Sequence, residues 1–504
     1  MRQLSFINYE NFQPRLYQEM IALTAIKRNT LCIIPTGLGK TYIAILVSAW
    51  ILENKPGSKI LMLAPTRPLV NQHFETFVNS MNLDKSLFVA LTGKIKPQDR
   101  KSFYEKCRVF FATPQIINND IESGILDLSK FYLLIVDECH RSVKKYAYTE
   151  VAEKYFSQSL HPLVLGLTAS PGGMKDKIDE VKKTLRIESI ELRTEKDFDV
   201  KPYVKKVYAE KIYVELPEDF KLIRSLLDSY YKECLSALAE KNLLSSLNPL
   251  KKELLEAQKK LAELYQETKD RNIAKYLMIA SQAIKIEHAL ALLETQGIYP
   301  LHKYFLELKR NKIPSTIRLF KDRRIVDAVN KTSELYIKGY EHPKMSKLIE
   351  IVKKEIEEKK NVKIIVFANY RDTVNLIKLY LEKNGIEARE FIGQAKKYGK
   401  GLSQKEQIKI LNEFSYDVFN VLVSTSIGEE GISIPDVDIV IFYESVPSEI
   451  RSIQRRGRTG RTSTGKVVFL ITKNTRDEAY YWSALHKEKR MKNIISELKL
   501  RYKG

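Results

Sequence analysis

The chain has 504 residues, a hydrophobic content of 44% and a formal net charge of +22 at pH 7. The length fits about three domains, the apolar content excludes a disordered chain, and four cysteines without a Cys-x-x-Cys pair disfavour a zinc site or a disulfide framework. The charge favours a polyanionic partner, with nucleic acid as the leading candidate, although general basicity for solubility explains it about as well.

The first part of the chain alternates short apolar runs with longer amphipathic segments, from residue 31 to about residue 190. The apolar runs at 59–64 and 131–136 are examples. This alternation predicts a parallel sheet covered by helices, which is an α/β lobe.

Residues 35–41, Pro-Thr-Gly-Leu-Gly-Lys-Thr, lie between an apolar run and a helical pattern, which is the context of a phosphate-binding loop. Gly37 and Gly39 would let backbone N–H groups approach phosphates, Lys40 would reach the β and γ phosphates, and Thr41 would hold Mg²⁺. The first glycine of the strict pattern is missing, so on the loop alone a plain glycine turn stays open. We predict that ATP is bound by Pro35, Thr36, Gly37, Leu38, Gly39, Lys40 and Thr41.

The tetrapeptide Asp137-Glu138-Cys139-His140 follows the apolar run at 131–136, where the chain leaves the predicted sheet beside the phosphate loop. Asp137 would hold the metal, often through water, and Glu138 would orient and deprotonate the attacking water. The structural alternative is an acidic pair at a helix N-cap, which the presence of Lys40 makes less favoured.

Glycine nearly disappears between residues 216 and 338, where Leu, Lys, Glu and Ala recur at helical spacing. This pattern predicts a helical insert, and the α/β alternation returns from about residue 362 as a second lobe. The basic residues of the insert could face a duplex, although an ordinary solvated helix face is the favoured interpretation of any single lysine. They include Lys251, Lys252, Lys259, Lys260, Arg318, Lys321, Arg323 and Arg324.

The octet at 454–461, Gln-Arg-Arg-Gly-Arg-Thr-Gly-Arg, combines paired arginines with glycines far downstream of the phosphate loop. Arginines supplied from a distant segment predict a site that is completed when two lobes close, with guanidinium charge stabilising a transferring phosphoryl group. Arg-Gly repeats also occur in RNA-binding tails, which is the alternative for the octet taken alone.

The order and spacing of these motifs resemble the superfamily 2 helicases of the DEAD/DEAH group. The resemblance implies two RecA-like lobes with ATP and Mg²⁺ as cofactors. It implies catalytic roles for Lys40, Asp137, Glu138, Gln454, Arg458 and Arg461, with Thr41 and Asp137 as metal ligands. It further implies adenine recognition by Arg15 and Gln18, coupling of hydrolysis to movement by His140, Thr168 and Ser170, and strand contacts by Thr66, Arg67, Thr92, Gly93, Thr113, Asn369, Arg371 and Thr425.

The strings at 391–395, 401–407 and 423–431 resemble more specifically the Fanconi anaemia M-type helicases. The likeness extends to the helicase half of the archaeal helicase-associated endonuclease for fork-structured DNA. It implies an ATP-dependent helicase or translocase that acts on branched DNA in replication-fork repair. The implied partners are forked DNA, a nuclease domain of the same polypeptide and a sliding clamp.

No acidic nuclease motif of the Glu-Arg-Lys type occurs in the chain, so we do not expect it to cut DNA, and we interpret it as the helicase part of a longer protein. No apolar run reaches the roughly 20 residues of a membrane span, so we expect a cytoplasmic protein without a membrane partner. The expected domains are 1–205, 206–340 and 341–504, as first lobe, helical insert and second lobe.

Two alternatives stay open. The first is a helicase or ATPase of the Dicer-like group directed at double-stranded RNA, because residues that grip phosphates do not themselves choose between sugars. The second is a scaffold that binds branched DNA without hydrolysing ATP, against which Lys40, Asp137, Glu138, Arg458 and Arg461 argue.

Overall fold

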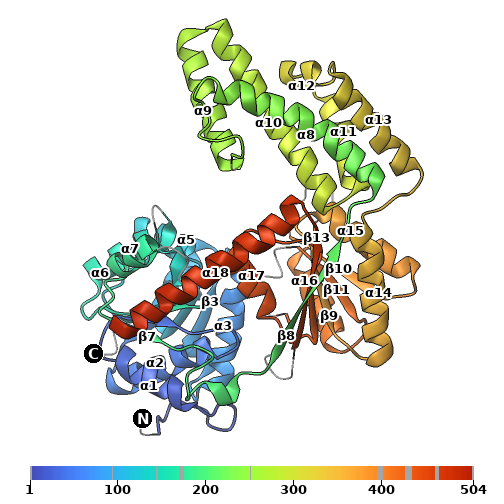
Figure 1. Ribbon diagram of the computed structural model, residues 1–504. Helices are drawn as coiled ribbons and strands as arrows, with labels where there is room; N and C mark the ends of the chain where they lie inside the picture. The colour runs from blue at the N-terminus through green and yellow to red at the C-terminus, as the bar shows by residue number, and fades with distance from the viewer. Residues whose placement is uncertain are drawn as a thin grey trace.

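Two α/β lobes lie side by side, and a bundle of helices rises from the second lobe (Figure 1). The expected fold class, two parallel-sheet lobes with an all-helical domain between them in the chain, is confirmed. The computed structural model describes residues 3–93, 95–143, 146–169, 175–249, 251–393, 401–425, 434–459 and 465–501.

The first lobe is built on a parallel sheet with the strand order β3-β4-β2-β5-β6-β1-β7. Its central strands are apolar and buried because helices cover both faces of the sheet. The strands are β1 (Thr30–Ile33), β2 (Lys59–Leu63), β3 (Phe88–Leu91), β4 (Val109–Ala112), β5 (Phe131–Asp137), β6 (Leu163–Thr168) and β7 (Ser189–Leu192). The helices are α1 (Leu16–Ala25), α2 (Lys40–Asn54), α3 (Arg67–Ser80), α4 (Pro97–Lys106), α5 (Pro114–Glu122), α6 (Ala147–Gln158) and α7 (Lys175–Thr184).

The second lobe has a parallel sheet with the order β10-β11-β9-β12-β13-β8. Its strands are β8 (Val207–Val214), β9 (Ile364–Phe367), β10 (Ala388–Phe391), β11 (Val421–Ser424), β12 (Ile439–Phe442) and β13 (Gly465–Thr472). Its helices are α14 (Pro343–Glu358), α15 (Arg371–Lys383), α16 (Gln404–Ser415), α17 (Glu449–Arg456) and α18 (Arg476–Arg501).

The strand β8 precedes the helical insert in the chain but belongs to the second sheet. It pairs in parallel with β13, from Val207 opposite Gly465 to Val214 opposite Thr472. The expected boundary at residue 206 assigned this strand to the insert, so the structure differs from the expectation here. The chain enters the second lobe first, then forms the insert, and then returns to the second lobe.

In the part that the structure describes, the helical insert packs six helices around a core of its own. Helical spacing places Phe220, Ile223 and Leu227 on one face of α8, and this face is buried in the bundle. Within the described residues, α10 alone is long and apolar enough to cross a membrane, and half of its apolar window is buried in the protein. The helices are α8 (Glu218–Ala239), α9 (Lys251–Thr268), α10 (Arg271–Thr295), α11 (Ile298–Arg310), α12 (Pro314–Leu319) and α13 (Arg323–Ile337).

Buried ion pairs join the insert to the second lobe. The Glu294 carboxylate at the end of α10 is fully buried, and its Oε1 lies 2.8 Å from Arg224 Nε and 3.0 Å from Arg476 Nη1. Within the second lobe, Lys344 Nζ of α14 lies 2.5 Å from Asp477 Oδ2 of α18 with both side chains fully buried. The base of the insert is therefore anchored by charged groups on α8, α10 and α18.

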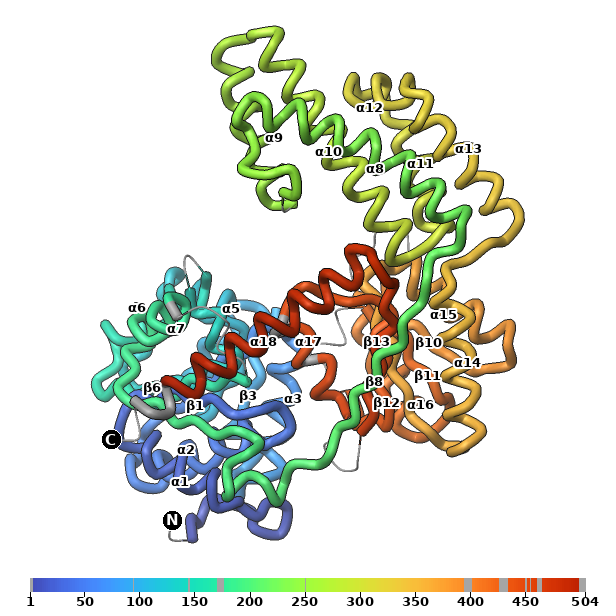
Figure 2. Tube along the Cα trace, viewed as in Figure 1, coloured from blue at the N-terminus to red at the C-terminus, as the bar shows by residue number. Residues whose placement is uncertain are grey.

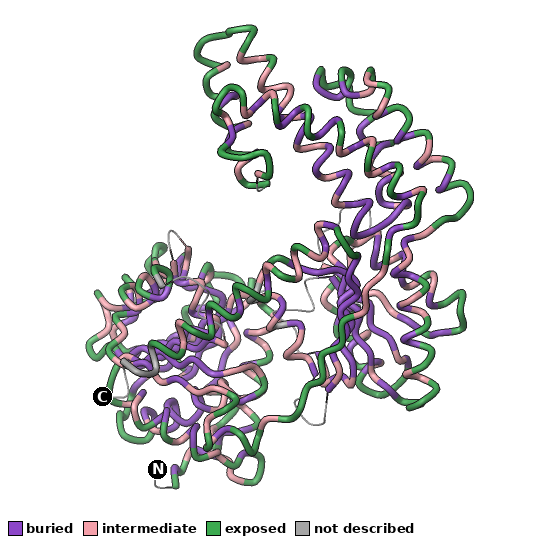
Figure 3. Tube along the Cα trace, in the orientation of Figure 1, coloured by how far each residue is buried: buried purple, intermediate pink, exposed green. Residues whose placement is uncertain are grey.

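The helix α18 runs from the second lobe across to the first (Figures 1 and 2). Near its far end, Ile494 and Ile495 pack against the apolar core of the first lobe. Nearer its middle, Glu488 pairs with Arg456 of α17. Burial is concentrated in the two sheets, whereas much of α18 is exposed (Figure 3). This helix is therefore a second connection between the lobes, in addition to the chain that leads into β8.

Candidate functional site

Three predicted ATP-site segments meet at one edge of the first sheet because β5, β6 and β1 are neighbours. The phosphate loop follows β1, the acidic pair ends β5, and Thr168 ends β6. The carboxyl ends of parallel strands lie at the same edge, which is where ligands bind in sheets of this kind. The topology therefore brings together Lys40, Asp137 and Thr168, which lie far apart in the sequence.

The phosphate loop contains two glycines in the left-handed region, Gly37 at φ 81° and Gly39 at φ 73°. Gly39 is the N-cap of α2, and Lys40 is the first residue of that helix. A helix N-terminus preceded by glycines in this conformation presents backbone N–H groups to an anion. A Cβ atom added at Gly39 would lie 2.7 Å from Gln18 Nε2, so the position accepts only glycine.

The predicted adenine-reading residues lie against this loop. Gln18 Nε2 donates a hydrogen bond to the Leu38 carbonyl at 3.2 Å, and Gln18 Oε1 accepts one from the Arg15 N–H at 2.9 Å. The Tyr17 hydroxyl also donates to the Leu38 carbonyl, at 2.7 Å, and burial raises the pKa of that hydroxyl. The Arg15 guanidinium stacks on the ring of Tyr203 at 4.3 Å. Base recognition by Arg15 and Gln18 stays a prediction, while Gln18 and Tyr17 fix the path of the phosphate loop.

A buried histidine lies between the two predicted metal ligands. His73 of α3 contacts Asp137 Oδ2 through Nε2 at 2.9 Å and Thr41 Oγ1 through Nδ1 at 3.4 Å. Burial favours the neutral form of Asp137, but the hydrogen bond from His73 and the charge of Lys40 outweigh it and lower the pKa of the carboxyl. Sequence reasoning missed His73, because no local motif distinguishes it.

The residues beside this histidine fit a hard cation. Thr41 contributes a hydroxyl oxygen and Asp137 a carboxylate oxygen, which are the ligand types that Mg²⁺ prefers. Within the described residues no cluster of three or more His, Cys, Asp or Glu side chains could hold a metal by itself. This is consistent with an ion whose remaining ligands are phosphate oxygens and water.

The expected general base is linked to the end of β6. Glu138 has φ 49°, a strained conformation for a residue with a side chain. Its Oε2 lies 3.3 Å from His140 Nδ1, and the same nitrogen lies 3.1 Å from Thr168 Oγ1. The His140 ring therefore connects the Glu138 carboxylate to the Thr168 hydroxyl, so a movement of Glu138 can be transmitted to Thr168. The other predicted coupling residue, Ser170, lies outside the described residues.

The arginine octet of the second lobe reaches the phosphate loop of the first. A Cβ atom added at Gly457 would overlap Thr36 Oγ1 and lie 2.9 Å from Thr36 Cβ, so the two segments are in contact. Arg458 follows directly, and its backbone N–H donates to the Arg455 carbonyl at 3.2 Å. Arg461 and the side chain of Gln454 lie outside the described part of the chain.

The paired arginines that precede Gly457 hold the octet in place. Arg455 is fully buried, lies over the ring of Phe367 at 5.0 Å, and donates from Nη2 to Asn369 Oδ1 at 2.8 Å. Arg456 points instead to Glu488 of α18. Burial of the Glu488 carboxyl opposes its ionisation, but Arg456 and Lys492 outweigh it, so its pKa is lowered. These two arginines connect the octet to the second sheet and to α18.

The predicted strand contacts of the first lobe lie at the other half of the same sheet edge. Thr66 and Arg67 follow β2, Gly93 follows β3 and Thr113 follows β4, and these strands are neighbours in the order β3-β4-β2. Thr66 and Thr113 are the N-caps of α3 and α5, and a Cβ atom at Gly93 would meet Arg67 Nη2 at 2.6 Å. Thr92, between β3 and Gly93, belongs to the same group. Helix N-termini and a guanidinium are suited to backbone phosphates.

The second lobe repeats this arrangement. Asn369 and Arg371 follow β9, and Thr425 follows β11, in the neighbouring order β10-β11-β9. Arg371 Nη2 donates to the Gly393 carbonyl after β10 at 3.1 Å, whereas Thr425 is largely buried. The Asn369 side-chain oxygen is engaged by Arg455, so one of its polar atoms is already used within the protein. Contacts of these residues with a strand stay predictions.

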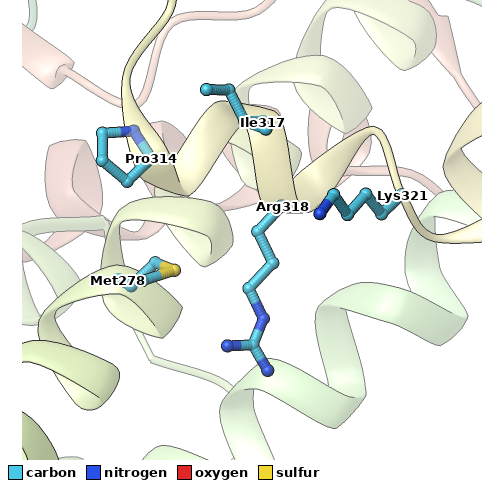
Figure 4. A pocket seen from close by; sticks show the side chains of 5 residues that line it. All are labelled: Met278, Pro314, Ile317, Arg318 and Lys321. Atoms are coloured by element: carbon cyan, nitrogen blue, oxygen red, sulfur yellow. The ribbon is translucent and has the colours of Figure 1, made fainter.

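The basic residues of the insert mostly lie beside acidic ones. Ion pairs of 2.7–3.8 Å involve Lys251, Lys252, Lys259, Arg323 and Arg324. Arg318 and Lys321 instead line a pocket of about 490 Å³ with Met278, Pro314 and Ile317 (Figure 4). Most of these basic side chains therefore agree with an ordinary solvent-exposed helix face. Arg318 and Lys321 differ from them because they line the pocket.

Three family models match the chain. The model described as type III restriction enzyme, res subunit, covers residues 7–173, and the helicase conserved C-terminal domain covers residues 343–463. Between them, residues 219–338 match a helical-bundle model provisionally described as that of an ATP-dependent RNA helicase.

Similar proteins match over nearly the whole chain. The Hef helicase domain of Pyrococcus furiosus is 45% identical, with a TM-score of 0.74 over 95% of this chain and 100% of that one. A Methanocaldococcus jannaschii protein that carries the provisional name of an ATP-dependent RNA helicase is 46% identical over 98% of this chain. An ATP-dependent DNA helicase of Pyricularia oryzae is 32% identical over 96% of this chain. The chain spans only 62% and 46% of the lengths of these last two relatives.

Proposed function

Because the chain belongs to the superfamily 2 helicases, a family of nucleic-acid-dependent ATPases, we propose that it is an ATP-driven helicase or translocase for branched or fork-structured DNA. A DNA substrate is supported by the relative named as a DNA helicase and by the motif strings that resemble the fork-directed group. The proposal places the protein inside the cell with the DNA. A nuclease domain and a sliding clamp are retained as proposed partners.

The observation that carries this proposal is the contact between Gly457 and Thr36. It brings a segment of the second lobe to the phosphate loop of the first, and Arg458 is the next residue after this contact. An ATP site shared between two lobes changes shape when its nucleotide changes. Lobe closure of this kind is how a motor converts hydrolysis into movement of a strand.

In this proposal the site residues have the following roles, and that of Arg461 rests on the motif resemblance because this residue lies outside the described part of the chain. Lys40 and the backbone of the glycine loop bind phosphates, and Glu138 is placed to orient the attacking water and accept its proton. Arg458 and Arg461 stabilise the charge of the phosphoryl group in the transition state. When bound, Mg²⁺ supplies charge neutralisation at the phosphates, and Thr41 and Asp137 hold it. His140 carries the change at Glu138 to Thr168.

Replacement of Lys40 tests the enzyme directly. In a Lys40→Ala protein we expect DNA-stimulated ATP hydrolysis to fall to background, because the cation that faces the β and γ phosphates is lost, while DNA binding through the backbone contacts persists. A Lys354→Ala variant is the control, because this lysine is exposed on α14, which lies on the side of the second lobe away from the first lobe (Figure 1). Normal turnover in Lys40→Ala would rule out the assignment.

The substrate is tested by ATP turnover with forked DNA, linear duplex DNA and double-stranded RNA at one salt concentration, since phosphate binding depends strongly on salt. We expect forked DNA to stimulate hydrolysis most. Stronger stimulation by double-stranded RNA would favour the second candidate, an RNA-directed ATPase, which the name of the M. jannaschii relative supports. A rate that no nucleic acid changes would leave only the scaffold interpretation.

A further inference from the structure

His73 makes two contacts that place it at the centre of the predicted metal site. Its Nε2 lies 2.9 Å from Asp137 Oδ2 and its Nδ1 lies 3.4 Å from Thr41 Oγ1. The side chains of His73 and Asp137 are only 6% and 7% exposed, so little water competes for these contacts. One rigid ring therefore touches both residues that are expected to hold Mg²⁺.

The hydrogen-bonding capacity of the groups fixes how the ring acts. An ionised carboxylate only accepts hydrogen bonds, so Nε2 of the ring donates to Asp137. In the tautomer whose single proton is on Nε2, Nδ1 can accept the hydroxyl proton of Thr41. This arrangement leaves the lone pairs of the Thr41 oxygen and the second oxygen of Asp137 for a cation. A histidine that orients a ligating carboxylate and hydroxyl in this way tunes a metal site without touching the metal.

The surroundings hold the three side chains firmly. His73 lies in the middle of α3, a helix of 14 residues whose Phe77 is fully buried in the first-lobe core. From the other side, the Tyr148 hydroxyl donates to the Asp137 carbonyl at 2.9 Å. Thr41 is in the first turn of α2. The ring therefore links three separate elements, α2, α3 and the end of β5.

We infer that His73 is a positioning residue of the ATP site, which holds the Asp137 carboxylate and the Thr41 hydroxyl in the geometry that the Mg²⁺ ion of MgATP requires. The inference rests on the proposed function, since it assumes that the loop binds ATP. His73 lies outside the phosphate loop and the acidic motif. The inference adds it to the residues that make the site prefer MgATP over metal-free ATP.

The test compares the binding of ATP with and without Mg²⁺, measured by calorimetry without turnover. In the unmodified protein we expect Mg²⁺ to tighten ATP binding. We call the increase in ATP affinity caused by Mg²⁺ the Mg²⁺-dependent gain. In His73→Ala we expect this gain to be about 10- to 100-fold smaller, which is the usual effect of removing a residue that orients a metal ligand. Binding of metal-free ATP should change by less than about twofold, because Lys40 and the glycine loop remain.

His73→Gln and His486→Ala complete the set. Glutamine keeps a hydrogen-bond donor for Asp137, but on a flexible side chain. We therefore expect a Mg²⁺-dependent gain between those of the unmodified protein and His73→Ala. If His73→Ala does not fold, the His73→Gln variant tests the inference instead. His486 is exposed on α18, and its replacement should leave the gain unchanged. A folded His73 variant with the full gain overturns the inference, as does one that loses metal-free ATP binding equally.

Failure of this inference is distinct from failure of the proposed function. If the unmodified protein binds ATP in neither form, the proposed function fails. If it binds both forms and the His73 variants keep the full Mg²⁺-dependent gain, only the positioning role of His73 fails.

Discussion

Gly457 of the second lobe lies against Thr36 of the first, and its lack of a side chain permits this contact. In Gly457→Ala we expect DNA-stimulated ATP hydrolysis to fall by about 10- to 100-fold, because the new methyl group would overlap Thr36 Oγ1 and overpacking of this kind costs about 1–3 kcal/mol. ATP binding by the first lobe should be nearly unchanged. Steady-state turnover and ATP affinity measure the two effects.

Thr36→Ala in the Gly457→Ala background is the control for this prediction. It removes the oxygen that the new methyl group would meet first, so part of the lost rate should return. An unchanged rate in Gly457→Ala alone would contradict the contact on which the proposed function rests.

Glu444 makes the stability of the second lobe depend on pH. Burial raises its pKa to about 7, although the Asn369 N–H, Lys344 and Arg455 favour its charged form. The folded protein thus binds this proton more tightly than the unfolded chain, whose glutamates titrate near pH 4.3. The stabilisation is complete below that value and is lost as the pH rises through about 7.

Replacing Glu444 with glutamine should remove this pH dependence. We expect Glu444→Gln to be more stable than the parent above pH 7 by up to about 3 kcal/mol, and the difference to shrink or reverse at pH 5. Urea unfolding at both pH values measures it. Burial also raises the pKa of Glu341 to about 7, but this group is present in both proteins and cancels in the comparison. An equal difference at both pH values would contradict the prediction.

The residues of the ATP site differ in how far the sequence reveals them. Lys40, Asp137 and Glu138 belong to short motifs that come just after apolar runs. The local sequence therefore predicts that they lie where the chain leaves a strand of the sheet. His73 has no such signal, because it meets Asp137 only through the pairing of β2 with β5. Arg455 is similar, since only the folded second sheet shows that its side chain is buried against Phe367 and Asn369.

At the scale of elements, α18 is a strap whose far end rests on the first lobe. We expect Ile494→Asp with Ile495→Asp to release this end, because two charges cannot stay against an apolar core without a large desolvation cost. Amide hydrogen exchange along the last turns of α18 should accelerate, while exchange in β1 to β7 should not change.

Asn493→Asp serves as the control for the strap. It adds a charge at an exposed position of the same helix, so exchange should stay as in the parent. Equal exchange in the double variant and the parent would show that the first-lobe contact of α18 is not maintained in solution.

Element boundaries were the least predictable part of the fold. The alternation of apolar and amphipathic segments predicts both sheets, and the glycine-poor stretch predicts the helices of the insert. The sequence does not reveal that β8 belongs to the second sheet, because its first five residues are exposed and its partner strand lies far along the chain. The expectation accordingly placed residues 207–214 in the helical insert.

At the scale of the whole molecule, Glu294 anchors the insert on the second lobe. We expect Glu294→Gln to destabilise the protein by about 1.5–3 kcal/mol, the range for hydrogen bonds to charged groups, because Arg224 and Arg476 lose their shared carboxylate. Urea unfolding measures the loss, and solution X-ray scattering should show a wider range of insert positions.

Glu256→Gln is the matched control for the anchor. Glu256 forms an exposed ion pair with Lys252 on α9, and exposed pairs of this kind contribute about 0–1 kcal/mol. Its replacement should leave the scattering curve unchanged. Equal effects of the two substitutions would show that Glu294 is not the anchor.

The place of β8 in the second sheet also bears on how the chain is made. Glu215, directly after β8, and Lys473, directly after β13, pair with each other although 258 residues separate them. On the ribosome, β8 therefore emerges long before the strand that it pairs with, and the local contacts of the insert can form in the meantime. The first lobe and the insert can fold during synthesis, whereas the second lobe is completed only when the last strand emerges. Until then, the edge of β8 that later pairs with β13 is unpaired and open to pairing with other chains.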